Sequence, residues 1–63
     1  MTTNATAKAE TIKTFRFASR ELAFRFADHS GGMAVMLGDD GRYWVATMAD
    51  CARLEAQGYQ WAD

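Results

Sequence analysis

Few side chains in this sequence could do covalent or metal chemistry. The chain holds one histidine, His29, and one cysteine, Cys51, and the patterns below put them on different elements. A thiol nucleophile needs a neighbouring base and a lowered pKa, and a zinc site needs several ligands at short, regular spacings. Because neither set can be assembled, we expect no enzyme activity, no catalytic residue, no metal site and no cofactor. We expect Cys51 to be a buried structural residue and His29 to lie at a helix C-terminus.

The acidic pair Asp39-Asp40 precedes Gly41 and could suggest a cation-binding loop. An EF-hand loop, however, takes about a dozen residues with ligands at alternating positions and a terminal glutamate. The paired glycines at 31–32 and those at 38 and 41 lack the lysine of a phosphate-binding loop. We therefore interpret these segments as turns.

Binding by aromatic and basic side chains is the chemistry that remains. Aromatic residues, methionine and arginine are enriched at protein interfaces, and aromatic faces beside arginine also stack nucleic-acid bases. The expected binding surface is an open sheet face with six such residues: Arg16, Met36, Arg42, Trp44, Tyr59 and Trp61. Our first hypothesis is protein–protein contact or self-association. The alternative is single-stranded or structured nucleic acid, held by four arginines: Arg16, Arg20, Arg25 and Arg42. The same rings could instead complete the core of so short a chain.

Length and composition limit the class of protein. A chain of 63 residues is one small domain, which buries only about 60% of the surface that its unfolded form exposes. A single cysteine excludes an intrachain disulfide. The first residues carry no apolar signal core, and no apolar run approaches the roughly 20 residues that span a bilayer. We therefore expect a cytoplasmic protein with no membrane partner. Residues 1–10 are expected to form a disordered tail before a single domain at 11–63.

Charge is distributed unevenly along the chain. The net charge is −1, with +2 on residues 1–30 and −3 on residues 31–63. This pattern lacks the basic excess of a domain that holds duplex DNA by its phosphates. The acidic second half would repel phosphates, which favours the protein-binding hypothesis over the nucleic-acid alternative.

The stretch from 32 to 47 predicts a β-hairpin, around which the other elements must be arranged. Two apolar runs with two-residue alternation flank a cluster that ends in Asp-Gly, the strongest short-range hairpin signal. An earlier strand is predicted within residues 11–18, where β-branched and aromatic residues alternate with other side chains. The alternation of Tyr59, Gln60 and Trp61 suits a last edge strand.

Two helices are predicted between these strands. Ser19 is a good N-cap for a helix over about residues 20–29, which Gly31 and Gly32 end. Thr47 is the N-cap of the second helix, with Asp50 in a capping-box-like position and Gly58 just past the end. The apolar positions of the first helix are Leu22, Ala23, Phe26 and Ala27, and those of the second are Met48, Cys51, Ala52 and Leu54.

The element order is therefore β-α-β-β-α-β, which predicts the α+β class. We expect a two-layer sandwich with both helices on one face of a small antiparallel sheet, a split β-α-β or ferredoxin-like arrangement in outline. Either Tyr43 or Trp44 would point to the opposite, open face, because neighbours in a strand alternate. The residues expected to face the helices are Phe15, Phe17, Val35, Leu37 and the other member of that pair.

The run GDDGRYWVATMADCARLEAQGYQ, residues 38–60, resembles small uncharacterised proteins of bacterial plasmids, phages and other mobile elements. The resemblance covers about a third of the chain. It lies in the succession of a short strand, a capped helix and a Leu-Glu-Ala-X-Gly-Tyr close. It implies no particular activity, but it favours an accessory or regulatory role.

Overall fold

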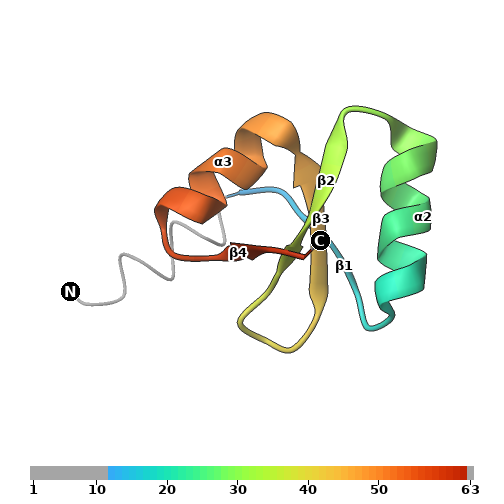
Figure 1. Cartoon of the computed structure of the whole chain (residues 1–63), viewed down its shortest axis with the longest axis horizontal. Helices are drawn as coiled ribbons and strands as arrows, with labels where there is room; N and C mark the ends of the chain where they lie inside the picture. The colour runs from blue at the N-terminus through green and yellow to red at the C-terminus, as the bar shows by residue number, and fades with distance from the viewer. Residues whose placement is uncertain (1–11, 63) are drawn as a thin grey trace.

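A computed structural model of the chain describes residues 12–62 and is shown in Figure 1. Its elements are β1 (Phe15–Phe17), α2 (Arg20–Ser30), β2 (Met33–Leu37), β3 (Tyr43–Thr47), α3 (Met48–Ala56) and β4 (Gln60–Trp61). The α+β class and the predicted β-α-β-β-α-β order are thereby confirmed, although β1 is shorter than the predicted first strand. The tail predicted at residues 1–10 lies outside the described residues.

The four strands form one antiparallel sheet in the order β1-β3-β2-β4, so the β2–β3 hairpin is central. Val45 of β3 is paired with Phe15 of β1 on one side and with Val35 of β2 on the other. The strands β1 and β2 are parallel to each other with β3 between them, and β3 and β4 are parallel with β2 between them. The fold therefore contains two split β-α-β units that share the hairpin.

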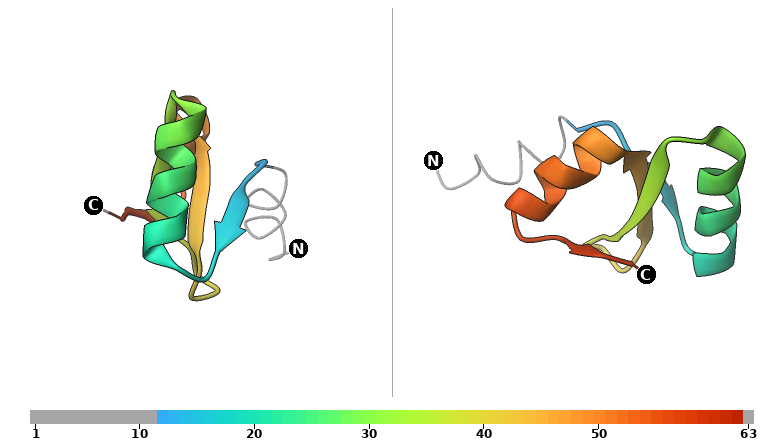
Figure 2. Two further views of the ribbon diagram at one scale, coloured as in Figure 1. Left: turned by 90° about the vertical axis from the view of Figure 1, so that its right-hand side faces the viewer. Right: turned by 45° about the horizontal axis from the view of Figure 1, so that its top comes forward.

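The two helices lie on opposite faces of the sheet, so the prediction of a shared face is wrong (Figures 1 and 2). Both β-α-β connections step in the same direction across the sheet, but they start on strands of opposite direction. Such connections are nearly always right-handed, and two right-handed connections of this kind must place their helices on opposite faces. Consequently α3 covers the face that was expected to be open.

The face under α3 holds the larger core side chains. Met36, Cys51 and Leu54 are completely buried, and Ile12, Trp44 and Ala46 complete the cluster. The face under α2 has a smaller core, in which Ala23 and Ala27 of the helix meet the two valines of the hairpin. Tyr43 packs against this second cluster while Trp44 belongs to the first, so both members of that pair face a helix.

Most of the predicted capping and turn residues lie where the helices and the hairpin begin or end. The Ser19 side chain accepts a hydrogen bond from the Leu22 N–H, at 3.3 Å, and the Thr47 side chain accepts one from the Asp50 N–H, at 3.2 Å. The carboxylate of Asp50 bonds Arg53 at 2.9 Å, so it does not act as a capping-box partner among the described contacts. Gly41 ends the hairpin turn with φ 79°, a conformation that glycine adopts at little cost.

Candidate binding surfaces

Two of the predicted surface residues are core residues. Met36 exposes 0% of its surface and Trp44 exposes 3%, because Leu54 and Cys51 of α3 pack in the same cluster. The prediction that these side chains form an exposed binding face is therefore wrong. A signal against it was present in the sequence, since residues 33–37 are all apolar, a pattern typical of a strand buried on both faces.

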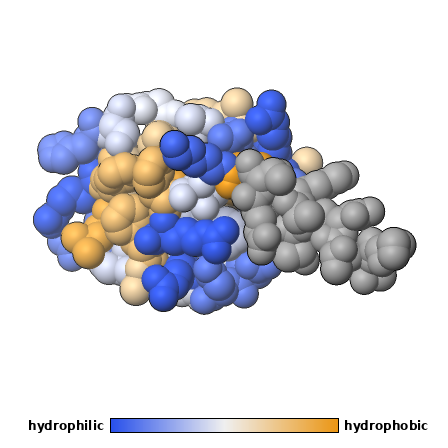
Figure 3. Space-filling view, turned by 180° about the vertical axis from the view of Figure 1, so that it is seen from behind, coloured by the Kyte–Doolittle hydropathy of each residue, from blue (hydrophilic) through white to orange (hydrophobic). Residues whose placement is uncertain are grey.

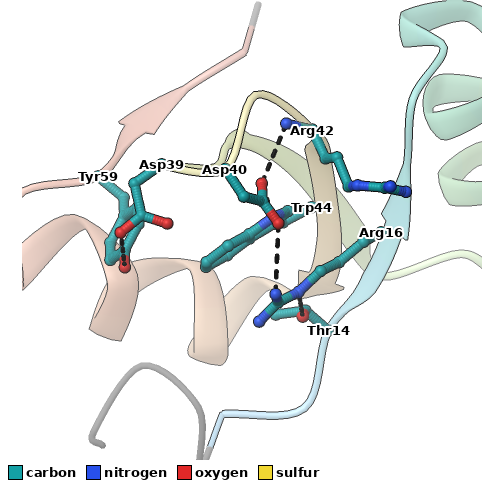
Figure 4. A network of polar contacts seen from close by, with 7 residues as sticks. All are labelled: Thr14, Arg16, Asp39, Asp40, Arg42, Trp44 and Tyr59. Carbon is teal, nitrogen blue, oxygen red and sulfur yellow. Dashed lines mark hydrogen bonds and ion pairs between the residues drawn. The ribbon is translucent and has the colours of Figure 1, made fainter. Parts of the chain in front are cut away.

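The margin of the Trp44 ring is covered by a polar network from three separate segments (Figure 4). The guanidinium carbon of Arg16 lies 4.0 Å from the ring centroid, a cation–π contact. Arg16 Nη1 also donates to Asp40 Oδ2 at 3.3 Å, and the indole N–H of Trp44 donates to Asp40 Oδ1 at 2.9 Å. This arrangement satisfies the one polar atom of the indole and ties β1 to the hairpin turn.

Asp40 is held in its charged form by this network. Partial burial by itself raises the pKa of Asp40. Hydrogen bonds from the Arg42 backbone N–H and the Trp44 indole, together with the charge of Arg16, outweigh burial and lower the pKa below its usual 3.8. The Asp40 side chain therefore acts as an anionic anchor for the turn.

Tyr59 extends the network on its other side. Its ring lies 5.1 Å from that of Trp44, and its hydroxyl donates to Asp39 Oδ2 at 3.1 Å. Partial burial raises the pKa of Tyr59, and the carboxylate of Asp39 raises it further. The hydroxyl thus remains a donor over the ordinary pH range, and the Tyr59 ring seals the core edge.

The space beside the Trp44 ring explains the glycine at position 38. A Cβ atom built on Gly38 would overlap the pyrrole part of the Trp44 indole. Only glycine therefore leaves room for the ring to lie against the turn and reach Asp40. Together, Arg16, Trp44 and Tyr59 form a structural clamp on this face, which is the use that the structure gives to three of the six predicted site residues.

The remaining predicted residues do not join the clamp. Trp61 is half-buried and packs beside Met36. Arg42 is exposed, and Figure 4 shows its side chain directed away from Trp44. Of the other predicted phosphate-binding arginines, Arg25 is paired with Glu21 at 3.0 Å, and the guanidinium carbon of Arg20 lies 4.6 Å from the Phe24 ring centroid. Both of these contacts are made with side chains of α2 itself.

An apolar surface that the sequence did not predict lies on the opposite face, where β1 meets α2 (Figure 3). Phe26 of α2 contacts both rings of β1, with centroid distances of 5.0 Å to Phe15 and 5.3 Å to Phe17. Phe15 remains 38% exposed, and Leu22, one helical turn before Phe26, is 50% exposed. We call these four residues the aromatic edge. The signal for it was the pair of phenylalanines at two-residue spacing, which the alternation alone places in the core.

A cleft of about 480 Å³ lies beside β2, away from the aromatic edge. Its lining is largely apolar and includes Phe24, Met33, Met48 and Trp61, with the carboxylate of Asp28 as the charged group. Its volume falls within the range of ligand pockets. It is the second surface on which apolar side chains are accessible.

Cys51 and His29, the two residues considered for covalent or metal chemistry, lie in different surroundings. The thiol of Cys51 is buried, and its Sγ lies 3.5 Å from the Ala46 carbonyl oxygen and 3.7 Å from that of Ala34. Burial raises the pKa of this thiol, which disfavours the reactive thiolate. His29 lies exposed in the last turn of α2. Within residues 12–62, no three metal-ligating side chains form a group that could hold an ion.

Comparisons with protein-family models, with curated proteins and with solved structures found no match to this chain. The resemblance to proteins of mobile elements therefore stays a prediction. In the described part of the chain, neither helix has the length and apolar character needed to cross a membrane.

Proposed function

We propose that this chain is a small, non-catalytic module that binds another protein through the aromatic edge. The observation that carries the proposal is the exposure of Phe15 and Leu22 beside Phe26. Apolar side chains that gather on a surface mark interaction sites, and aromatic anchors dominate the binding energy of protein interfaces. A chain this short needs its apolar side chains for its own core, so the ones left exposed call for a second use.

The intramolecular contacts of the arginines favour a protein partner over nucleic acid. Arg25 already pairs with Glu21, Arg16 with Asp40, and Arg20 covers Phe24. Phosphate binding depends on cations that can neutralise the backbone charge, and these three have intramolecular partners instead. The nucleic-acid alternative thus keeps only weaker support, from the basic excess of residues 12–30.

The cellular setting is proposed from the sequence. The single buried thiol suits a reducing compartment, so we propose the cytoplasm. The resemblance of residues 38–60 to proteins of plasmids and phages favours an accessory or regulatory partner of a larger machine.

A peptide-display selection against the immobilised full chain tests the function. We expect binders whose amide shift changes, in two-dimensional NMR spectra of the chain, map to β1 and α2. The double variant Phe15→Thr/Leu22→Gln should weaken them at least tenfold, since truncating an aromatic anchor typically costs about 2 kcal/mol or more. Threonine keeps the strand propensity and glutamine the helix propensity, so the fold is retained.

Met48→Gln is the matched control, because Met48 is 54% exposed but lines the other apolar surface. Binders that lose affinity for Met48→Gln and keep it for the double variant would overturn the proposal. An oligothymidylate titration at low salt provides the second arm. Amide shifts on the arginines in that titration would favour the nucleic-acid alternative.

A further inference from the structure

The strand β1 is an edge of the sheet, paired only with β3 among the described strands. The hydrogen bonds at the two ends of the β2–β3 hairpin show which backbone groups of β3 point toward β2 and which point toward β1. The Gly38 N–H donates to the Arg42 carbonyl, and the Met48 N–H donates to the Gly32 carbonyl. Backbone bonding alternates along an antiparallel pair, so the β3 residues that bond β2 are 44 and 46. Residues 43 and 45 must then bond β1.

Tyr43 and Val45 are paired with Phe17 and Phe15. The backbone N–H and C=O of Arg16, between them, consequently point away from the sheet. Within residues 12–62, this short strand thus presents one backbone donor and one backbone acceptor that no strand of the sheet uses, directly beside the aromatic edge. Exposed strand edges of this kind are templates for a further strand.

Side chains on the two sides of that edge differ in chemistry. Phe15 and Phe17 point to the α2 face, where Phe26 contacts both rings. Arg16 points to the opposite face, where its side chain is 38% exposed and donates to Asp40 through one of its nitrogens. Residues directly opposite each other in neighbouring strands share a face. An added strand would therefore place apolar side chains beside the phenylalanines and one side chain beside Arg16.

Resting on the proposed function, we infer that β1 binds an extended segment of apolar–acidic–apolar sequence by adding it as a fifth strand. The acidic residue exchanges both backbone hydrogen bonds with Arg16, and its carboxylate lies next to the part of the guanidinium that Asp40 leaves exposed. The two flanking apolar residues extend the aromatic edge. Residues 12–30 carry four basic side chains and two acidic ones, and this net positive charge favours a segment with an acidic residue. A second copy of the chain is disfavoured, because a symmetric antiparallel β1–β1 pair centred on Arg16 would place two arginines opposite each other.

The probe is a blocked five-residue peptide, acetyl-Thr-Val-Glu-Val-Thr-amide, titrated into the full chain and followed by amide NMR. We expect shifts on β1 and α2 and a downfield shift of the Arg16 amide proton. Methylating the backbone nitrogen of the glutamate removes one inter-strand hydrogen bond and should weaken binding about tenfold. Methylating the second valine nitrogen, which points away from β1, is the matched control and should change binding less than about threefold.

The contribution of the central charge is tested with the same peptide carrying lysine in place of glutamate. It should bind about two- to fivefold more weakly than the glutamate peptide, and Arg16→Gln should remove that difference. If both N-methyl peptides bind as well as the parent at the aromatic edge, strand addition is wrong while the proposed function stands. If none of the peptides shifts β1 at millimolar concentration, strand addition is also wrong, and the display selection decides the proposed function separately.

Discussion

The two faces of the sheet are closed to different degrees. Under α3, Met36, Leu54 and Cys51 are fully buried, and the Arg16–Asp40–Trp44 network covers the rim of that core. Under α2, the buried residues are alanines and valines, and the surrounding phenylalanines stay partly exposed. The α3 face therefore supplies the fully buried core, whereas the α2 face leaves apolar side chains accessible, and it is there that we propose binding.

The physical reason is the size of the side chains that the two helices supply. Leucine and cysteine of α3 meet methionine and tryptophan, which together fill the space between helix and sheet. Ala23 and Ala27 bring α2 close to the hairpin valines, and the larger rings are then displaced to the margin. Those rings become the aromatic edge.

The largest effect should come from truncating the closed face. Leu54→Ala removes a fully buried side chain and should lower the free energy of unfolding by about 2–5 kcal/mol. A domain of this size rarely has more than roughly 3–5 kcal/mol, so much of the variant should be unfolded. Leu22→Ala, on the α2 face, should cost less than about 1 kcal/mol. Urea denaturation followed by circular dichroism measures both, and equal losses would contradict the distinction between the faces.

Gly38→Ala should be the next most damaging change, because its methyl group collides with the indole of Trp44. Overpacking of this kind costs about 1–3 kcal/mol. The matched background is Trp44→Phe, which lacks the pyrrole ring that the methyl would meet. A double-mutant cycle in urea should show that the alanine costs less in that background. Strict additivity would show that the collision is relieved elsewhere.

Asp40→Asn tests the network at the rim, with an expected loss of about 1 kcal/mol at pH 7. The pKa of Asp40 is lowered in the folded state, so its stabilisation is complete above the unfolded pKa near 3.8 and disappears as pH falls through the folded pKa. The difference between variant and parent should therefore shrink in acid. Asp28→Asn, a carboxylate at the cleft, should stay within about 0.5 kcal/mol of the parent at both pH values.

Phe15→Thr, on the α2 face, should cost little stability but much binding. The ring is 38% exposed and threonine suits a strand, so the free energy of unfolding should fall by less than about 1 kcal/mol. Binding of the selected peptides should nevertheless fall strongly. Thermal unfolding and peptide titration on the same sample separate the two effects. A stability loss as large as that of Leu54→Ala would make Phe15 a core residue and remove it from the proposed surface.

The sequence alone determined the elements and most of their ends, although not the length of β1. Ser19, Thr47 and the Asp-Gly turn act through hydrogen bonds and backbone conformations within three residues, so their effect can be recognised locally. The buried role of Cys51 also followed from the apolar stripe of its helix. The α+β class and the element order are consequences of these local patterns.

Only the tertiary structure decided which face each helix covers, and with it the location of the candidate site. That choice depends on the strand order and on the handedness of two connections, which no local pattern contains. It buried Trp44, brought Arg16 and Asp40 together from positions 24 residues apart in the chain, and left Phe15 at an open edge. Local propensity specifies where a strand or helix forms, whereas contact between distant segments decides which of its side chains remain available.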